Sequence, residues 1–182
     1  ILHLLYARFF VKALADMEAM DDAMLAAVKG MGVAVAALGN HEFDWGQDTL
    51  RARLGQSPFP WVSANLFDSA TGRRVPWVDS HRLLTVGGLR VAVVGYMTKH
   101  FKRVIKAEHT RGLQVRPGVA AIRDVLDSVR AARPDIVILL AHEGGSCDGR
   151  SCRGEIFELA EELGPGGVDL IVAGHTHSRI AD

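Results

Sequence analysis

The sequence predicts an α/β fold with one antiparallel hairpin inserted into it. Short apolar runs, as expected of buried strands, alternate along the chain with segments that have helical spacing. The Gly-Gly pair at 87–88 separates two strand-like runs, which is typical of a two-residue hairpin turn. The chain has 182 residues, 48% of them hydrophobic, so one domain can bury a sizeable core.

The elements of the first third follow from spacing and from their end signals. The first helix repeats its apolar residues at three-, four- and seven-residue spacings and is stopped by Gly30 and Gly32. A nearly continuous apolar run that ends at Gly39 indicates a buried strand. In chain order we expect a helix over 10–28, a strand over 33–38, a helix over 47–54 and a strand over 61–64.

The remaining elements continue the alternation after the hairpin. Pro117 is expected at the first turn of a helix, where its missing N–H costs nothing. The basic stretch over 99–116 is expected to be an irregular, solvated loop with no function beyond contacts on the substrate side. In chain order we expect strands over 81–86 and 89–96, a helix over 117–132, a strand over 135–141, a helix over 155–163 and a strand over 168–173.

Charge and hydropathy exclude several classes of partner. Lys plus Arg (21) equals Asp plus Glu (21), so the balance gives no reason to expect a nucleic-acid polymer or an acidic membrane. The longest apolar runs, such as 136–141, are too short to span a bilayer. No signal-peptide pattern is visible, and because the chain begins at Ile1 rather than Met we expect a piece of a longer protein.

The two cysteines, Cys147 and Cys152, lie in a glycine-rich segment with four residues between them. They are either a short-loop disulfide or a pair of free thiols, and the sequence leaves both open. A zinc knuckle needs four ligands, and no second cysteine pair exists to complete one.

Polar clusters directly follow three of the expected buried strands, at 39–44, 142–145 and 174–177. Sites in open α/β sheets form beyond the carboxyl ends of strands, so these clusters are expected to converge. Imidazole nitrogens and amide oxygens are ligands for Zn, Mn or Fe. His175 and His177 are expected to alternate along an extended segment, which places the two rings on opposite sides and suits two adjacent metal ions.

Three motifs carry a family resemblance: Gly-Asn-His-Glu-Phe-Asp at 39–44, His-Glu-Gly at 142–144 and Gly-His-Thr-His at 174–177. Together they resemble the calcineurin-like metallophosphoesterases. Asp-Trp-Gly at 44–46, Ser-Ala-Asn-Leu at 63–66 and the segment over 147–157 are similar to the 5'-nucleotidase branch. The resemblance covers about 28–178 in the correct order, and it implies a layered α-β-β-α sandwich flanked by helices, incomplete at both ends of this chain.

The resemblance also implies a site with two divalent metal ions, Zn, Mn or similar, and roles for individual residues. The first ion would be held by Asn40, His142 and His175, and the second by His177. His41 would be the catalytic imidazole, oriented by Asp44 three residues later. The implied reaction is hydrolysis of phosphate monoesters, with nucleoside 5'-monophosphates as substrates, in a periplasmic or extracellular enzyme of nucleotide catabolism. A disulfide would agree with that location.

Two other polar residues near these motifs receive lesser roles. Glu42 is expected to be a structural or supporting carboxylate. Asn65 is expected to border the site without being a metal ligand.

Two acidic blocks of the family are absent: an Asp-x-His after the first strand, and a Gly-Asp that bridges the metals. Leu4, Leu5 and Tyr6 follow where the first block is expected, and the only upstream aspartates lie on the expected first helix, where a solvated face explains them: Asp16, Asp21 and Asp22. Without an anionic ligand a dication is held weakly. We therefore expect residues 1–182 to be part of a catalytic domain, without the nucleotide-binding domain, that alone has little or no activity.

Other functions stay open. A relative within the class would act on cyclic nucleotides, nucleotide sugars or sulfur-carrier substrates. A non-catalytic descendant would keep the fold as a scaffold or binding module; the missing acidic blocks favour it, and the retained histidines oppose it. A dinucleotide-binding domain is excluded because no glycine fingerprint follows the first strand.

Overall fold

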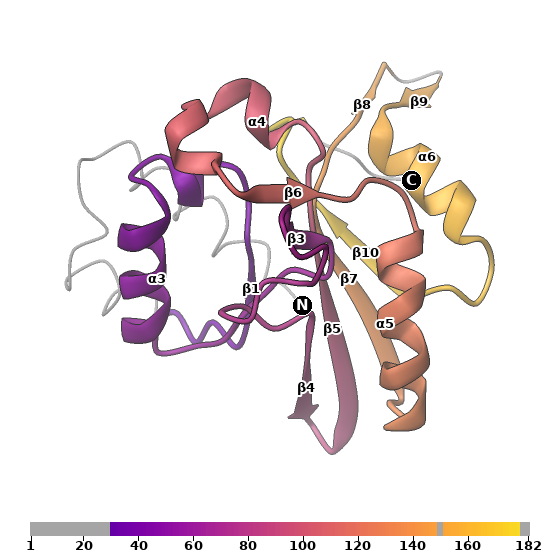
Figure 1. Ribbon diagram of the computed structural model, residues 1–182. Helices are drawn as coiled ribbons and strands as arrows, with labels where there is room; N and C mark the ends of the chain where they lie inside the picture. Colours follow the sequence, from indigo (N-terminus) through magenta and orange to yellow (C-terminus); the bar gives the residue numbers. More distant parts are fainter. Residues whose placement is uncertain (1–29, 149–150, 179–182) are drawn as a thin grey trace.

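A computed structural model describes residues 30–148 and 151–178 of the chain. At its centre is a four-stranded sheet in the order β10-β7-β5-β4 (Figure 1). The hairpin strands β4 (His81–Val86) and β5 (Leu89–Met97) are antiparallel. β7 (Ile136–His142) runs parallel to β5 and to β10 (Leu170–Ala173). The expected helix over 10–28, with its three aspartates, lies outside the described residues.

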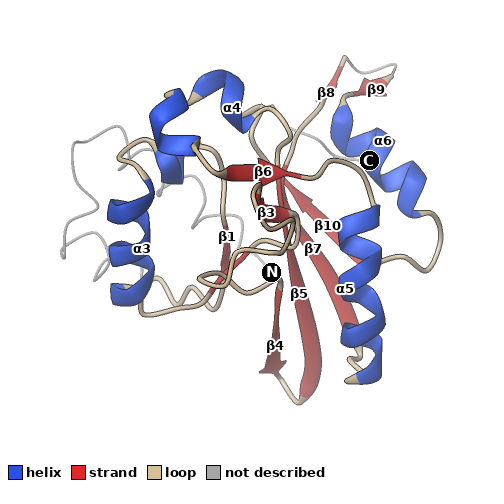
Figure 2. Cartoon of the chain, viewed as in Figure 1, coloured by secondary structure: helices blue, strands red, loops and turns tan. Residues whose placement is uncertain are grey.

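Helices and strands alternate along the chain and two helices pack on the sheet, so the expected α/β class is confirmed (Figure 2). α5 (Ala120–Ala131) and α6 (Glu155–Leu163) pack on one face through a core cluster that includes Ile122 and Leu139. The opposite face contacts the small parallel pair β1 (Ala36–Ala37) and β2 (Trp61–Val62).

Beyond that pair lies α3 (Gln47–Gln56), whose Leu50 belongs to a further cluster with Trp61 and Phe43. The layers are therefore helices, sheet, a second small sheet and helix. This is the order expected of an α-β-β-α sandwich.

Several element boundaries differ from the sequence prediction. The strand expected over 61–64 ends at Val62 because Ser63 donates its N–H to Asp79 and Ala64 donates to Gly95, on other segments. The strand expected over 33–38 keeps only the two residues of β1 in register with β2. The helix expected from Pro117 begins at Ala120, because Gly118 adopts a left-handed φ of 74°.

The basic stretch over 99–116 is not an irregular loop, and that prediction is wrong. It contains α4 (Phe101–Val104), the 3-10 turn η2 (Ala107–Thr110) and the strand β6 (Leu113–Val115). β6 pairs antiparallel with β3 (Leu66–Asp68), a strand that the sequence did not predict. Apolar residues interleaved with the basic ones drive this order: the Phe101 ring lies 5.5 Å from that of Phe43, centroid to centroid.

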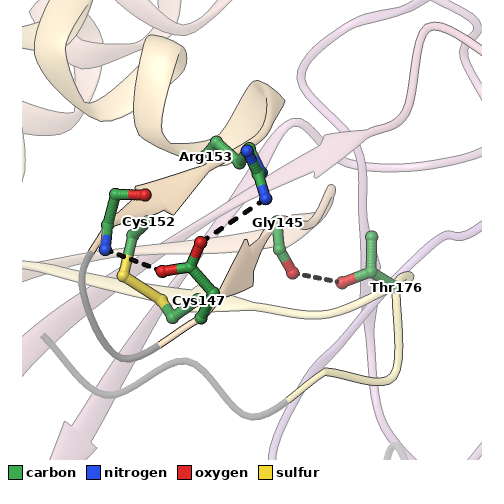
Figure 3. The surroundings of a disulfide bond; sticks show 7 residues. Gly145, Cys147, Cys152, Arg153 and Thr176 are labelled. Atoms are coloured by element: carbon green, nitrogen blue, oxygen red, sulfur yellow. Dashed lines mark hydrogen bonds and ion pairs between the residues drawn. A yellow bond between two sulfur atoms is a disulfide. The ribbon is translucent and has the colours of Figure 1, made fainter.

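The two cysteines form a disulfide bond, which settles the question that the sequence left open. The bond joins β8 (Ser146–Cys147) to β9 (Cys152–Arg153), two short antiparallel strands directly after the end of β7 (Figure 3). Within the described residues, no helix has the length and apolar character needed to cross a membrane.

Candidate active site

Three strand ends bring the predicted polar residues to one edge of the fold. His142 is the last residue of β7, and its neighbour Ala141 is in register with Ala173, the last residue of β10. His175 follows two residues later. Asn40 precedes the 3-10 turn η1 (His41–Phe43), just after β1. The parallel arrangement of β7 and β10 therefore explains why His142 and His175 reach the same edge.

The side chains of Asn40, His142 and His175 meet there. Asn40 Oδ1 lies 2.6 Å from His142 Nε2, and His142 Nε2 lies 3.1 Å from His175 Nδ1. The two imidazole rings are 4.8 Å apart, centroid to centroid, at an interplanar angle of 56°. Asn40 is only 1% exposed. One amide oxygen and two imidazole nitrogens, from three separate segments, thus lie close together. The sequence predicted this convergence of the clusters.

The loop that carries Asn40 is fixed by its neighbours. A Cβ on Gly39 would lie 2.5 Å from His142 Nδ1, so only glycine allows the imidazole to approach this closely. The N–H of Gly39 donates to Glu42 Oε2 at 2.6 Å, which gives Glu42 a contact of the supporting kind that the sequence suggested. Asn65 is also at this edge of the sheet: its amide bonds both the carbonyl and the N–H of Met97, which is in register with His142.

His41 and Asp44 form a pair on η1. The 3-10 geometry places residues three apart on the same side, and His41 Nδ1 lies 2.8 Å from Asp44 Oδ2. The side chains are 42% and 37% exposed, so the imidazole is accessible from solvent while one of its nitrogens is held. This geometry suits a ring whose other nitrogen exchanges a proton with a bound molecule.

His175 and His177 do not lie on an extended segment, and that expectation is wrong. Both adopt left-handed φ angles, 78° for His175 and 57° for His177, because the chain turns after β10. Thr176 between them donates its N–H to the carbonyl of Gly174 at 3.0 Å. Simple alternation of the rings therefore does not apply. His177 is exposed, whereas the three converging side chains belong to buried or partly buried residues.

A second polar cluster, which the sequence did not predict, lies beside His142. Glu143 is 3% exposed, and burial next to Glu155 raises its pKa to about 7. Glu155 Oε1 accepts hydrogen bonds from Lys99 Nζ and His100 Nε2, both at 2.6 Å. Burial acts to raise the pKa of Glu155, but these hydrogen bonds together outweigh burial and lower the pKa to about 2. The one feature of the sequence that could have indicated this cluster is the basic pair Lys99-His100, shortly after the apolar run that forms β5.

The converging donors fit a single divalent ion in part. An amide oxygen and two imidazole nitrogens are suitable ligands for Zn or Mn, and they already lie about as close together as ligands of one ion. The converging set contains no carboxylate. Among residues 30–148 and 151–178, no group of three or more His, Cys, Asp or Glu side chains is arranged to hold a metal.

Comparison with known proteins identifies the family. A sequence profile of the family described as "Bacterial capsule synthesis protein PGA_cap" matches residues 17–179. The chain is 31% identical over 159 residues to a 5'-nucleotidase of Vibrio cholerae, a match that covers 84% of this chain and 28% of that protein.

Solved structures of similar proteins share the fold of this chain. The 5'-nucleotidase precursor of Thermus thermophilus superposes with a TM-score of 0.70 at 27% identity, over 91% of this chain and 29% of that one. The calcineurin-like phosphoesterase YfkN of Bacillus subtilis shares the fold, with a TM-score of 0.72 at 23% identity over 94% of this chain and 53% of that one. The chain therefore belongs to the family described as bacterial capsule synthesis protein PGA_cap, and it is similar to 5'-nucleotidases and has the fold of a calcineurin-like phosphoesterase.

Proposed function

We propose that the protein to which this chain belongs hydrolyses phosphate monoesters with the help of divalent metal ions, and that its substrates are nucleoside 5'-monophosphates. The observation that carries the proposal is the convergence of Asn40, His142 and His175 from three strand ends, beside the His41–Asp44 pair. The 5'-nucleotidase relatives support the substrate class. The chain spans only 28% of the Vibrio cholerae protein, so the activity of the whole protein is part of the proposal.

Metal binding is assigned to the converging side chains. Asn40, His142 and His175 would hold one ion, and His177 would serve the second. A divalent ion supplies Lewis-acid charge that stabilises a phosphoryl group under attack. Asn40 is buried, and its amide oxygen faces His142 at hydrogen-bond distance, which supports this assignment for the first ion.

His41 would handle the proton of the leaving group. Asp44 accepts a hydrogen bond from His41 Nδ1, and this contact fixes the orientation of the ring. When the ring carries a proton on both nitrogens, Nε2 is the one left to donate a proton to the departing ribose oxygen, or to donate a hydrogen bond to phosphoryl oxygens. The partial exposure of this pair lets a substrate reach it.

The absence of a carboxylate from the converging set bears on affinity. Three neutral ligands hold a dication more weakly than a set with an anionic member. We therefore propose that residues 1–182, as part of a catalytic domain, bind metal weakly and turn over slowly by themselves. The Cys147–Cys152 disulfide supports a periplasmic or extracellular location for the protein.

Phosphate release from a nucleoside 5'-monophosphate, with millimolar Mn²⁺ or Zn²⁺, tests the function. Turnover should be low for this chain, should require the metal, and should be lost in His41→Ala and His142→Ala. His81→Ala is the matched control, because His81 lies at the start of β4 and its ring bonds only to its neighbour Ser80 in the described structure. If the chain binds metal but releases no phosphate, and His41→Ala leaves the metal binding unchanged, the result would favour the non-catalytic scaffold.

A further inference from the structure

We infer that Thr176, held by the disulfide-closed hairpin β8–β9, is a positioning residue that keeps His175 against His142. The inference rests on the proposed function only in treating His175 as a metal ligand. The contacts themselves are independent of that role, and they connect the disulfide to the turn through one hydrogen bond.

The turn that carries His175 and His177 needs support from outside. Both residues have left-handed φ angles, 78° and 57°, which side chains with a Cβ adopt at some cost in free energy. Such conformations persist only where neighbouring structure holds them. Within the turn, the N–H of Thr176 bonds the carbonyl of Gly174, a local contact that does not tie the turn to the rest of the fold.

Besides the approach of His175 to His142, two hydrogen bonds tie the turn to the segment after β7. The hydroxyl of Thr176 donates to the carbonyl of Gly145 at 2.8 Å (Figure 3). The N–H of Gly174 donates to the carbonyl of Glu143 at 3.1 Å. A Cβ on Gly144 would clash with the Gly174 carbonyl and with the Thr176 side chain, which shows how closely the two segments are packed. Of these two hydrogen bonds, the one from Thr176 is donated by a side chain and the other by the backbone.

The Gly145 carbonyl is in turn fixed by the neck of the hairpin. Gly145 directly precedes β8, and a Cβ on Gly154, which follows β9, would lie 2.5 Å from its Cα. The disulfide between Cys147 and Cys152 closes the hairpin two residues beyond this neck on each strand. An ion pair from Arg153 to Asp148, at 3.5 Å, adds to the closure. Opening the hairpin would therefore free the acceptor of Thr176.

These contacts predict how the turn responds when either end is removed. Thr176→Val keeps the shape of the side chain and loses the hydroxyl, whereas Thr176→Ser keeps the hydroxyl. The double variant Cys147→Ser/Cys152→Ser removes the closure and leaves Thr176 intact. Thr85→Val is the matched control, because Thr85 is exposed on β4.

The first test is hydrogen exchange of the Gly174 amide by NMR in the metal-free chain. Exchange should be about threefold to tenfold faster in Thr176→Val, the range expected for loss of one neutral hydrogen bond, and unchanged in Thr176→Ser and Thr85→Val. The Asp169 amide, which bonds the Val137 carbonyl near the other end of β10, is the internal reference for global loosening. The cysteine variant should also accelerate exchange at Gly174, and combining it with Thr176→Val should add little further.

The second test is the affinity for Mn²⁺ alone by calorimetry. It should fall in Thr176→Val and in the cysteine variant, and recover in Thr176→Ser. Equal exchange at Gly174 in Thr176→Val and wild type would overturn the inference, as would fully additive effects of the two changes. If no form binds Mn²⁺ but the exchange pattern is as expected, the proposed metal site fails and the positioning role of Thr176 stands.

Discussion

Replacing Gly39 by Ala should push the His142 ring away from Asn40. The new Cβ would lie 2.5 Å from His142 Nδ1 and 2.6 Å from Cε1, closer than real Cβ contacts allow. An ordinary contact needs about 3.5 Å, so the ring must move by about 1 Å. The Asn40–His142 distance of 2.6 Å would then exceed hydrogen-bond range.

The magnitude follows from overpacking. Forcing an extra methyl into a packed site costs about 1–3 kcal/mol, and a ring that swings aside keeps the cost near the lower end. For a chain of this length, about 2–4 °C of melting temperature corresponds to each kcal/mol. Affinity for Mn²⁺ should fall by about tenfold or more, because a displaced imidazole no longer faces the other two donors.

Gly55→Ala is the control for this substitution. Gly55 lies inside α3, and a Cβ added to it would meet no described atom within 4 Å beyond the backbone of its own helix. The change should stabilise the chain by about 0.5–1 kcal/mol, because alanine loses less backbone entropy in a helix. Urea denaturation gives the free energy of unfolding, and the histidine NMR spectrum reports on the ring. A Gly39→Ala variant with unchanged stability and unchanged His142 resonances would refute the steric argument.

Three further outcomes are expected from urea denaturation. Glu155→Gln should make the free energy of unfolding depend less on pH under acid conditions. The fold lowers the pKa of Glu155 to about 2, so the stability that its carboxylate contributes is present above pH 4.5 and is lost as the pH falls towards 2. Glu143 is already protonated throughout this window. The acid limb should be unchanged only if the Lys99 and His100 contacts are absent. Leu139→Ala, in the fully buried core of β7, should cost about 2–5 kcal/mol, whereas Leu83→Ala on the exposed edge strand should cost far less; equal costs would contradict the assigned burial. Gly95→Ala should lower the free energy of unfolding by about 3 kcal/mol or more, because the new Cβ would clash with the backbone of β2. A small decrease would mean that β5 and β2 are not in contact.

The elements that the sequence predicts well are those with strong local signals. The bounds of α6 agree with the prediction, because apolar residues recur at helical spacing between Gly154 and Gly164. The Gly87-Gly88 turn fixes the hairpin, and both glycines adopt the left-handed φ that such a turn requires. The convergence of the polar clusters was also predictable, since it follows from parallel strands that end at one edge.

What the sequence could not show depends on contacts between distant segments. β3 and β6 exist only because each pairs with the other, with Leu66 in register with Val115 far along the chain. Glu143 and Glu155 are brought into contact by the packing of α6 on β7. The left-handed turn after β10 depends on the hydrogen bond from Thr176 to a different segment, and no local spacing indicates it.

Calorimetric titration of the chain with Mn²⁺ or Zn²⁺ tests the central claim, that Asn40, His142 and His175 together form a site for a divalent ion. The structure predicts one weak class of site that is lost in Asn40→Ala, in His142→Ala and in His175→Ala, and retained in His81→Ala. Binding that persists unchanged in all three variants, with their folds intact by circular dichroism, would contradict the claim and place the metal elsewhere.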